Sequence, residues 1–118
     1  MADRFIISNT FSLRMLEYCF HELIFEPIPQ DCVRDILKNV LKDEPEKFIS
    51  VVGHESTARR FSEILGIDVP VNRANYTFRL GDNLIVGIPK TQRLPEGKVL
   101  DEEELKKLGF EWWLVRFA

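Results

Sequence analysis

Cysteine and histidine are scarce in this sequence, which contains two of each. Cys19 and Cys32 form no Cys-x-x-Cys pair, and no histidine lies at the spacing that a zinc site requires. We therefore expect two buried thiols in a reducing compartment, and neither a disulfide, a bound metal nor a cofactor.

Long apolar runs and an excess of positive charge are also absent. No apolar run approaches the roughly 18 residues that span a bilayer, and the run after Arg4 is too short for a signal peptide. These absences predict a cytoplasmic protein with no membrane partner. The net charge is −3 and the isoelectric point is near 5.4. Because proteins that coat nucleic acids need a basic surface, we expect no stable DNA or long RNA partner.

The composition is that of a globular protein. The chain has 118 residues, of which 45% are hydrophobic and 30% charged, so we predict a single domain, residues 1–118. Predicted strands and helices are interspersed, which is typical of an α/β fold; we expect a mixed sheet of about five strands with flanking helices. The predicted strands are 4–8, 22–26, 47–52, 76–80, 84–88 and 110–117, and the predicted helices are 13–17, 32–41, 58–65 and 102–108.

Several of these segments carry more specific expectations. Residues 47–52 are expected to form the central strand. Asp31 is expected to cap the helix 32–41. Residues 76–88 read as a β-hairpin, which excludes an all-parallel sheet. The strand 110–117 is apolar on both faces, so we expect helices or a second subunit to cover both sides.

A glycine and a histidine stand where the strand 47–52 gives way to a helix. Gly53 and His54 are followed by Ser56 and Thr57, which open the helical pattern. The first-turn N–H groups and the dipole of a helix attract anions, phosphates above all, so His54 would stand beside a bound phosphate. The alternative is that Ser56 or Thr57 is only an N-cap and His54 a polar loop residue.

The strand 4–8 ends in a similar way, because Asn9, Thr10 and Ser12 precede a short predicted helix. The two junctions line one pocket if their strands are neighbours, a point that the sequence leaves open. Residues 90–98 form the one long irregular segment, which is either functional or a plain solvated connection.

Four segments, taken together, carry a resemblance to a known family. They are Asn9-Thr10-Phe11-Ser12, Gly53-His54-Glu55-Ser56-Thr57, Asn72-Arg73 and residues 92–100, with the sequence QRLPEGKVL. In this order and at these separations they resemble the viral ring nucleases, anti-CRISPR proteins of archaeal viruses and bacteriophages that destroy the cyclic tetra-adenylate messenger of type III CRISPR systems. The resemblance covers nearly the whole chain, although residues 17–47 match only in pattern.

The resemblance implies a metal-independent phosphodiesterase that is a two-fold homodimer, with one cyclic tetra-adenylate held across the axis. If the chain is virus-encoded, it would act in the host cell cytoplasm. The resemblance also implies that His54, Arg93 and Glu96 are catalytic. The implied substrate pocket contains Asn9, Thr10, Ser12, Gly53, Ser56, Thr57, Arg73 and Gln92. Pro95 departs from the acidic residue common at its position, and we expect it to stiffen the loop and leave the chemistry unchanged.

These residue types suit the implied chemistry. An RNA phosphodiester cleaved by its own 2′-hydroxyl needs in-line geometry, charge stabilisation and a proton for the departing 5′-oxygen, and none of these demands a metal. His54 can supply the proton, Arg93 can offer a bidentate fork to the phosphate, and Glu96 can orient a guanidinium or a ribose hydroxyl. The products would be linear di-adenylates.

Three other functions are compatible with these patterns. A binding module would sequester the cyclic nucleotide without cleaving it, through the same anion-binding junctions. A nucleic-acid-binding regulator is disfavoured by the acidic isoelectric point and by the lack of a basic stripe. A dimeric structural protein would use the helix start at Ser56 as an ordinary cap.

Overall fold

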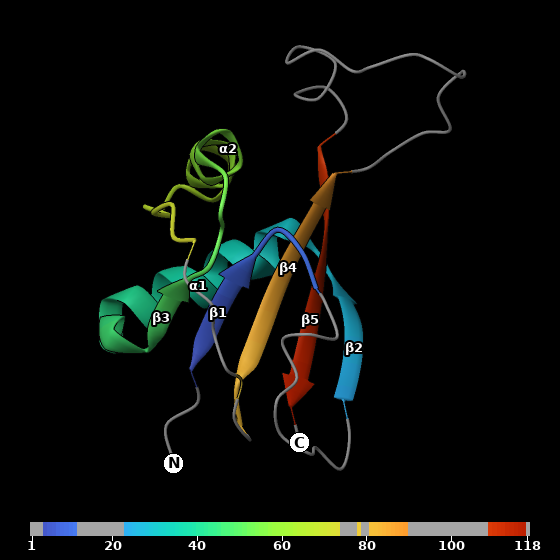
Figure 1. The fold of residues 1–118 in the computed structure, drawn as a ribbon. Coiled ribbons are helices and arrows are strands. Elements are labelled where there is room, and N and C mark those ends of the chain that lie inside the picture. The colour runs from blue at the N-terminus through green and yellow to red at the C-terminus, as the bar shows by residue number, and fades with distance from the viewer. Residues whose placement is uncertain (1–3, 12–22, 74–77, 79–80, 90–108, 118) are drawn as a thin grey trace, which may run out of the picture.

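The computed structural model describes residues 4–11, 23–73, 78, 81–89 and 109–117 (Figure 1). Their strands are β1 (Phe5–Ser8), β2 (Leu23–Ile28), β3 (Phe48–Ser50), β4 (Asn83–Pro89) and β5 (Phe110–Phe117). Their helices are α1 (Gln30–Asp43), the short 3₁₀ helix η2 (Pro45–Lys47) and α2 (Glu55–Leu65).

The five described strands form one mixed sheet in the order β2-β5-β4-β1-β3. β3, β1 and β4 are parallel to one another, whereas β5 is antiparallel to both β4 and β2. The expected α/β fold, with a mixed sheet and flanking helices, is therefore confirmed. Within the described residues, no helix is both long and apolar enough to cross a membrane.

The sheet buries apolar side chains on both faces, because successive residues of a strand point to opposite sides. The register partners Ile7, Ile85 and Leu114 share one face and pack with buried residues of α1 and α2. The register partners Ile6, Leu84 and Val115 share the other face and pack with a second cluster. That cluster contains Phe78, whose ring stacks on Phe117 at a centroid distance of 4.5 Å.

The helices form where the apolar residues recur at helical spacing. Val33 and Leu37 are the buried centre of the α1 stripe, and Ala58, Phe61 and Leu65 are that of α2. α2 ends at Gly66, whose φ of 66° is left-handed, as the sequence predicted for a helix-terminating glycine.

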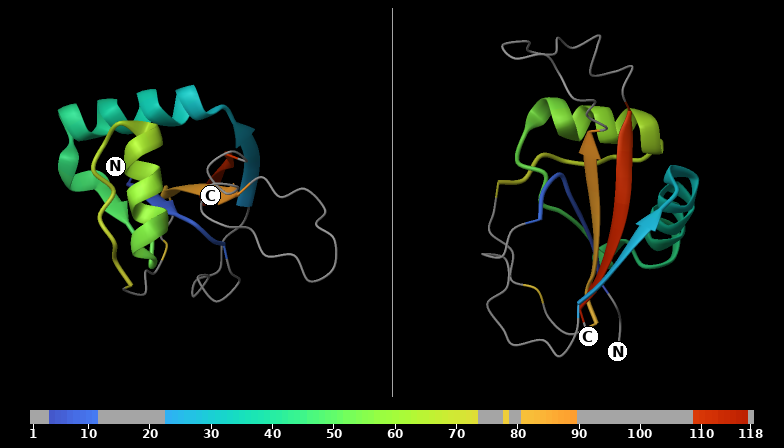
Figure 2. Two further views of the ribbon diagram at one scale, coloured as in Figure 1. Left: turned by 90° about the horizontal axis from the view of Figure 1, so that it is seen from above. Right: turned by 90° about the vertical axis from the view of Figure 1, so that its right-hand side faces the viewer.

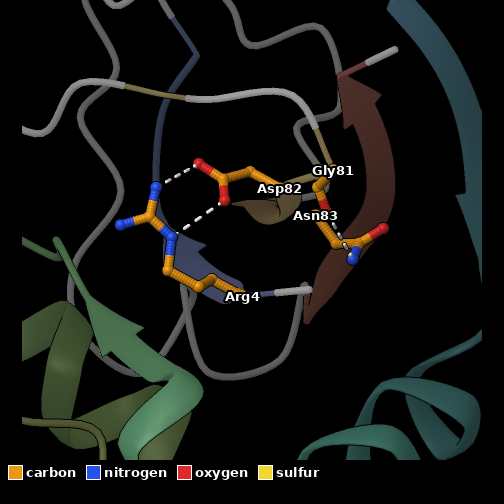
Figure 3. Close-up of polar contacts among 4 residues, drawn as sticks. All are labelled: Arg4, Gly81, Asp82 and Asn83. Carbon is orange, nitrogen blue, oxygen red and sulfur yellow. Dashed lines mark hydrogen bonds and ion pairs between the residues drawn. The ribbon is translucent and has the colours of Figure 1, made fainter. Parts of the chain in front are cut away.

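An ion pair joins the starts of β1 and β4 at the amino edge of the three parallel strands (Figure 3). Arg4 donates from Nε and Nη2 to the two carboxylate oxygens of Asp82, each at 2.9 Å, and Asp82 is buried. The main chain adds a bond from Asn83 N to Arg4 O at 2.9 Å. Bidentate geometry and burial make this pair a strong determinant of the β1–β4 register.

One expectation about the strands is wrong. The run 47–52 is not central: among the described strands, β3 pairs with β1 alone and lies at the edge of the sheet. Its side chains are apolar because they pack on both faces of the sheet, Phe48 and Val52 in the cluster of Ile7, and Ile49 and Val51 against the cluster of Ile6. Residues 70–72 also cover that edge, where Asn72 N donates to Val52 O at 2.8 Å and Ser50 Oγ donates to Pro70 O. Both faces of β5 are covered, as expected: Trp112 and Leu114 pack with residues of α1 and α2, and Val115 and Phe117 are buried in the cluster on the other face.

Two expectations about α1 are also wrong. Pro29 occupies the N-cap position and Asp31 lies within the first helical turn, so Asp31 does not cap the helix. Cys32 is exposed, because it lies at the margin of the apolar stripe whose centre is Val33 and Leu37. Cys19, the predicted helices 13–17 and 102–108, and most of the predicted strand 76–80 lie outside the described residues.

Candidate functional site at the carboxyl edge of the sheet

The parallel strands β1, β3 and β4 all end at one edge of the sheet. Ile7 is the register partner of Ser50, and Val51 N donates to Ile7 O at 2.9 Å, so β1 and β3 are paired up to the point where both leave the sheet. The two polar junctions predicted from the sequence therefore lie side by side. β4 ends at the same edge, and its last residue, Pro89, leads into residues 90–108.

The two junctions leave the sheet on opposite faces. The buried residues of α2, which follows β3, pack with Ile7 and Ile85 on the first face. Phe11, which follows β1, packs against the cluster of Ile6 and Leu84 on the second face. Figure 2 shows α1 on one side of the sheet and the segment after β1 on the other. In open α/β sheets, ligands bind outside the carboxyl ends of strands at such a switch point.

His54 is the N-cap residue of α2, with φ −121° and ψ 128°, and its side chain is exposed. It makes no side-chain capping hydrogen bond in the described structure, whereas its carbonyl accepts from Ala58 N at 2.9 Å. Ser56 and Thr57 lie inside the first turn, so the alternative in which one of them is the N-cap is wrong. The arrangement leaves an imidazole beside the first-turn N–H groups of a helix.

Cationic side chains of α1 stand at the opposite end of α2. Arg34 donates from Nη2 to Ile64 O at 2.7 Å, and the Lys38 side chain ends beside Gly66. Cations at a helix C-terminus compensate the partial negative charge of the last carbonyl groups. At the His54 end, the carboxylate of Glu55 lies in the first turn and compensates part of the positive end of the dipole, while no side chain caps the first-turn N–H groups in the described structure.

Arg73 reaches the junction from the segment that follows α2. Its Nε donates to Gly53 O at 2.9 Å, and its side chain is exposed. A Cβ atom added at Gly53 would have Arg73 Cγ at 3.7 Å as its nearest neighbour, so the packing does not demand glycine there. The structure thus brings the Arg73 guanidinium to the main chain of Gly53, beside His54.

β1 and β3 both end in a buried serine. Ser8 Oγ donates to Thr10 O at 2.9 Å and accepts from Thr10 N at 3.2 Å, which turns the chain at half-buried Asn9 and exposed Thr10. Ser50 Oγ donates to Pro70 O at 2.6 Å. The sequence analysis missed these two supports, although a serine directly after two apolar strand residues was a signal common to both.

The predicted site residues divide into two groups. Asn9, Thr10, Gly53, His54, Ser56, Thr57 and Arg73 are described, and they belong to the two adjoining junctions and to the segment that borders β3. Ser12, Gln92, Arg93 and Glu96 lie outside the described residues, so their predicted roles stay predictions. In the part of the chain that is described, no three His, Cys, Asp or Glu side chains gather as a metal site would require.

The model of the STIV B116-like family matches residues 5–112 of the sequence, which is most of the chain. The chain belongs to the STIV B116-like family. A solved structure of the same kind, B116 of Sulfolobus turreted icosahedral virus, superposes with a TM-score of 0.74 at 25% sequence identity, covering 96% of this chain and 98% of that one.

Two proteins that are similar in sequence to this chain come from viruses. Uncharacterized protein 26 of Sulfolobus islandicus filamentous virus is 46% identical over 72 residues, and the match spans 60% of each chain. Uncharacterized protein ORF117 of Acidianus two-tailed virus is 36% identical over 80 residues, which are 67% of this chain and 68% of that protein. These relatives support a viral protein of the B116-like family.

Proposed function

We propose that this member of the B116-like family is a metal-independent ring nuclease, which binds cyclic tetra-adenylate and cleaves it to linear di-adenylates, switching off type III CRISPR signalling. The observation that carries the proposal is the pairing of β1 with β3, which sets the Asn9 and His54 junctions side by side at one edge of the sheet. The relatives in Sulfolobus and Acidianus viruses agree with an anti-CRISPR role.

The proposed reaction needs three contributions from the chain. The ribose 2′-oxygen attacks the adjacent phosphorus, the bond from phosphorus to the 5′-oxygen breaks, and the 2′-hydroxyl proton passes to solvent. The His54 imidazolium donates a proton to the departing 5′-oxygen. The first-turn N–H groups of α2, with Arg73 and Arg93, stabilise the charge on the phosphate, and Glu96 orients a guanidinium or a ribose hydroxyl.

A two-fold homodimer is part of the proposal. A cyclic tetra-nucleotide presents equivalent phosphates on opposite sides, and two symmetry-related copies of one site would meet them both. A dimer measured by light scattering at micromolar concentration is the expected result. A fully active monomer would contradict this part.

Product analysis tests the enzymatic proposal. The protein is incubated with cyclic tri-, tetra- or hexa-adenylate in the presence of EDTA, and the products are separated by chromatography. We expect cyclic tetra-adenylate to be converted to linear di-adenylate by the unmodified chain. A cyclic tetra-adenylate that is bound but recovered intact would instead identify a sequestering protein, which the same anion-binding junctions would serve.

A further inference from the structure

The dipeptide Asn72-Arg73 binds the main chain that leads to His54. Asn72 Nδ2 donates to Ser50 O at 2.8 Å, Asn72 N donates to Val52 O at 2.8 Å, and Arg73 Nε donates to Gly53 O at 2.9 Å. Two consecutive residues therefore hold three of the four carbonyl groups that precede His54.

These three hydrogen bonds, which together form the Asn72–Arg73 clamp, lie at the end of β3, where the chain separates from β1. The last sheet bond on the β1 side is from Val51 N to Ile7 O, so Val52 and Gly53 have left the ladder before α2 begins. The segment is also anchored directly before Asn72, because Ser50 Oγ donates to Pro70 O and Ser62 Oγ accepts from Val69 N at 2.9 Å. A bonded frame of this kind restricts the φ and ψ angles immediately before a catalytic group.

We propose that Asn72 is a positioning residue, which holds the main chain at Ser50 and Val52 and thereby sets the location of His54 without touching the substrate. The inference rests on the proposed function. Arg73 would act in two ways at once: Nε holds Gly53 O, and Nη1 and Nη2, which have no hydrogen-bond partner among the described residues, form a fork for a phosphate.

Removing the Asn72 amide should therefore slow the chemistry rather than weaken binding. Displacement of a reacting group by about 1 Å costs roughly a hundredfold in rate, so we expect Asn72→Ala to lower single-turnover cleavage of cyclic tetra-adenylate by about ten- to a hundredfold. The Kd for the substrate should change by less than about threefold, because the phosphate ligands stay in place. Asn72→Asp, which turns a donor into a carboxylate facing Ser50 O, should have an effect of at least the same size.

A matched control exists at the amino edge of the sheet. Asn83 Nδ2 also donates to a main-chain carbonyl, that of Gly81, at 3.4 Å (Figure 3). Asn83→Ala makes the same chemical change far from His54, so it should leave the cleavage rate within about twofold of the unmodified chain.

A double-mutant cycle separates positioning from general stability. If Asn72 acts through His54, Asn72→Ala should cause no further loss of rate in a His54→Ala background. An equal loss in both backgrounds would overturn the inference. It would also be overturned if Kd rose in proportion to the loss of rate, or if both Asn72 variants failed to fold by circular dichroism.

A measurement without substrate keeps this inference distinct from the proposed function. The ¹⁵N relaxation order parameters of Gly53 and His54 should fall from about 0.85 to about 0.6 in Asn72→Ala and stay unchanged in Asn83→Ala. Unchanged values in Asn72→Ala would overturn the positioning role even if the chain cleaves its substrate. Failure of the unmodified chain to cleave cyclic tetra-adenylate would refute the function, and the order parameters would still decide whether Asn72 orders the junction.

Discussion

Replacement of Gly87 by alanine tests how the sheet supports α2 and the junction at its start. Gly87 lies in β4, is the register partner of Trp112, and lies against the ring of Phe61 of α2. A Cβ atom there would lie 2.6 Å from Trp112 Cζ3 and 2.7 Å from Phe61 Cζ, closer than side-chain carbons approach in proteins. Both aromatic residues are buried, and their ring centroids are 4.8 Å apart, so neither can move without displacing the other.

The cost of Gly87→Ala follows from that overlap. Overpacking of a well-filled core lowers the free energy of unfolding by about 1–3 kcal/mol, whereas the reduced conformational entropy of the unfolded chain raises it by about 0.4–1 kcal/mol. The free energy of unfolding should therefore fall by about 1–2 kcal/mol. For a domain of this size, that loss corresponds to a decrease in Tm of roughly 4–8 °C. Thermal unfolding followed by circular dichroism measures it.

Gly53→Ala is the matched control for that measurement, because its added Cβ would meet Arg73 Cγ at 3.7 Å, an ordinary contact. The Tm of Gly53→Ala should lie within about 2 °C of the unmodified value. If Gly87→Ala were as stable as Gly53→Ala, the packing of Phe61 and Trp112 over β4 would not be what holds α2 in place.

Further predictions concern the proposed chemistry. Gly53→Ala should fold normally and yet raise the Kd for cyclic tetra-adenylate by roughly tenfold in calorimetry if the ligand passes close to that main chain; an unchanged Kd would show that it does not. His54→Ala should lower single-turnover cleavage by roughly 10²- to 10⁴-fold with affinity nearly intact. Equal losses of binding and cleavage would make His54 a pocket residue. Arg93→Ala should raise the activation free energy by about 3 kcal/mol in steady-state kinetics, whereas Arg59→Ala, whose side chain is 68% exposed, should have little effect; equal effects would place the phosphate elsewhere. Cleavage should persist in EDTA, and rescue of a chelated, inactive protein by a divalent ion would refute the metal-independent mechanism.

Local patterns were sufficient for the elements whose residues interact within one segment. The α2 stripe and its terminating glycine, Gly66, were predictable because helical contacts recur three or four residues apart and a left-handed C-terminus favours glycine. Local patterns failed at the start of both helices. His54 and Pro29 occupy the N-cap positions, although the sequence offered serine, threonine or aspartate there, because the packing of the whole helix fixes where its first turn begins.

The sequence by itself therefore determined two features of the candidate site: an imidazole after a glycine at a strand-to-helix junction, and a second polar junction. Only the tertiary structure decided that β1 is the neighbour of β3, that β3 lies at the edge of the sheet, and that Asn72 holds the chain before His54. The physical reason is the range of the contacts. Asn72 and Ser50 are 22 residues apart and Arg4 and Asp82 are 78 apart, and no local periodicity records which distant hydrogen-bonding groups will meet.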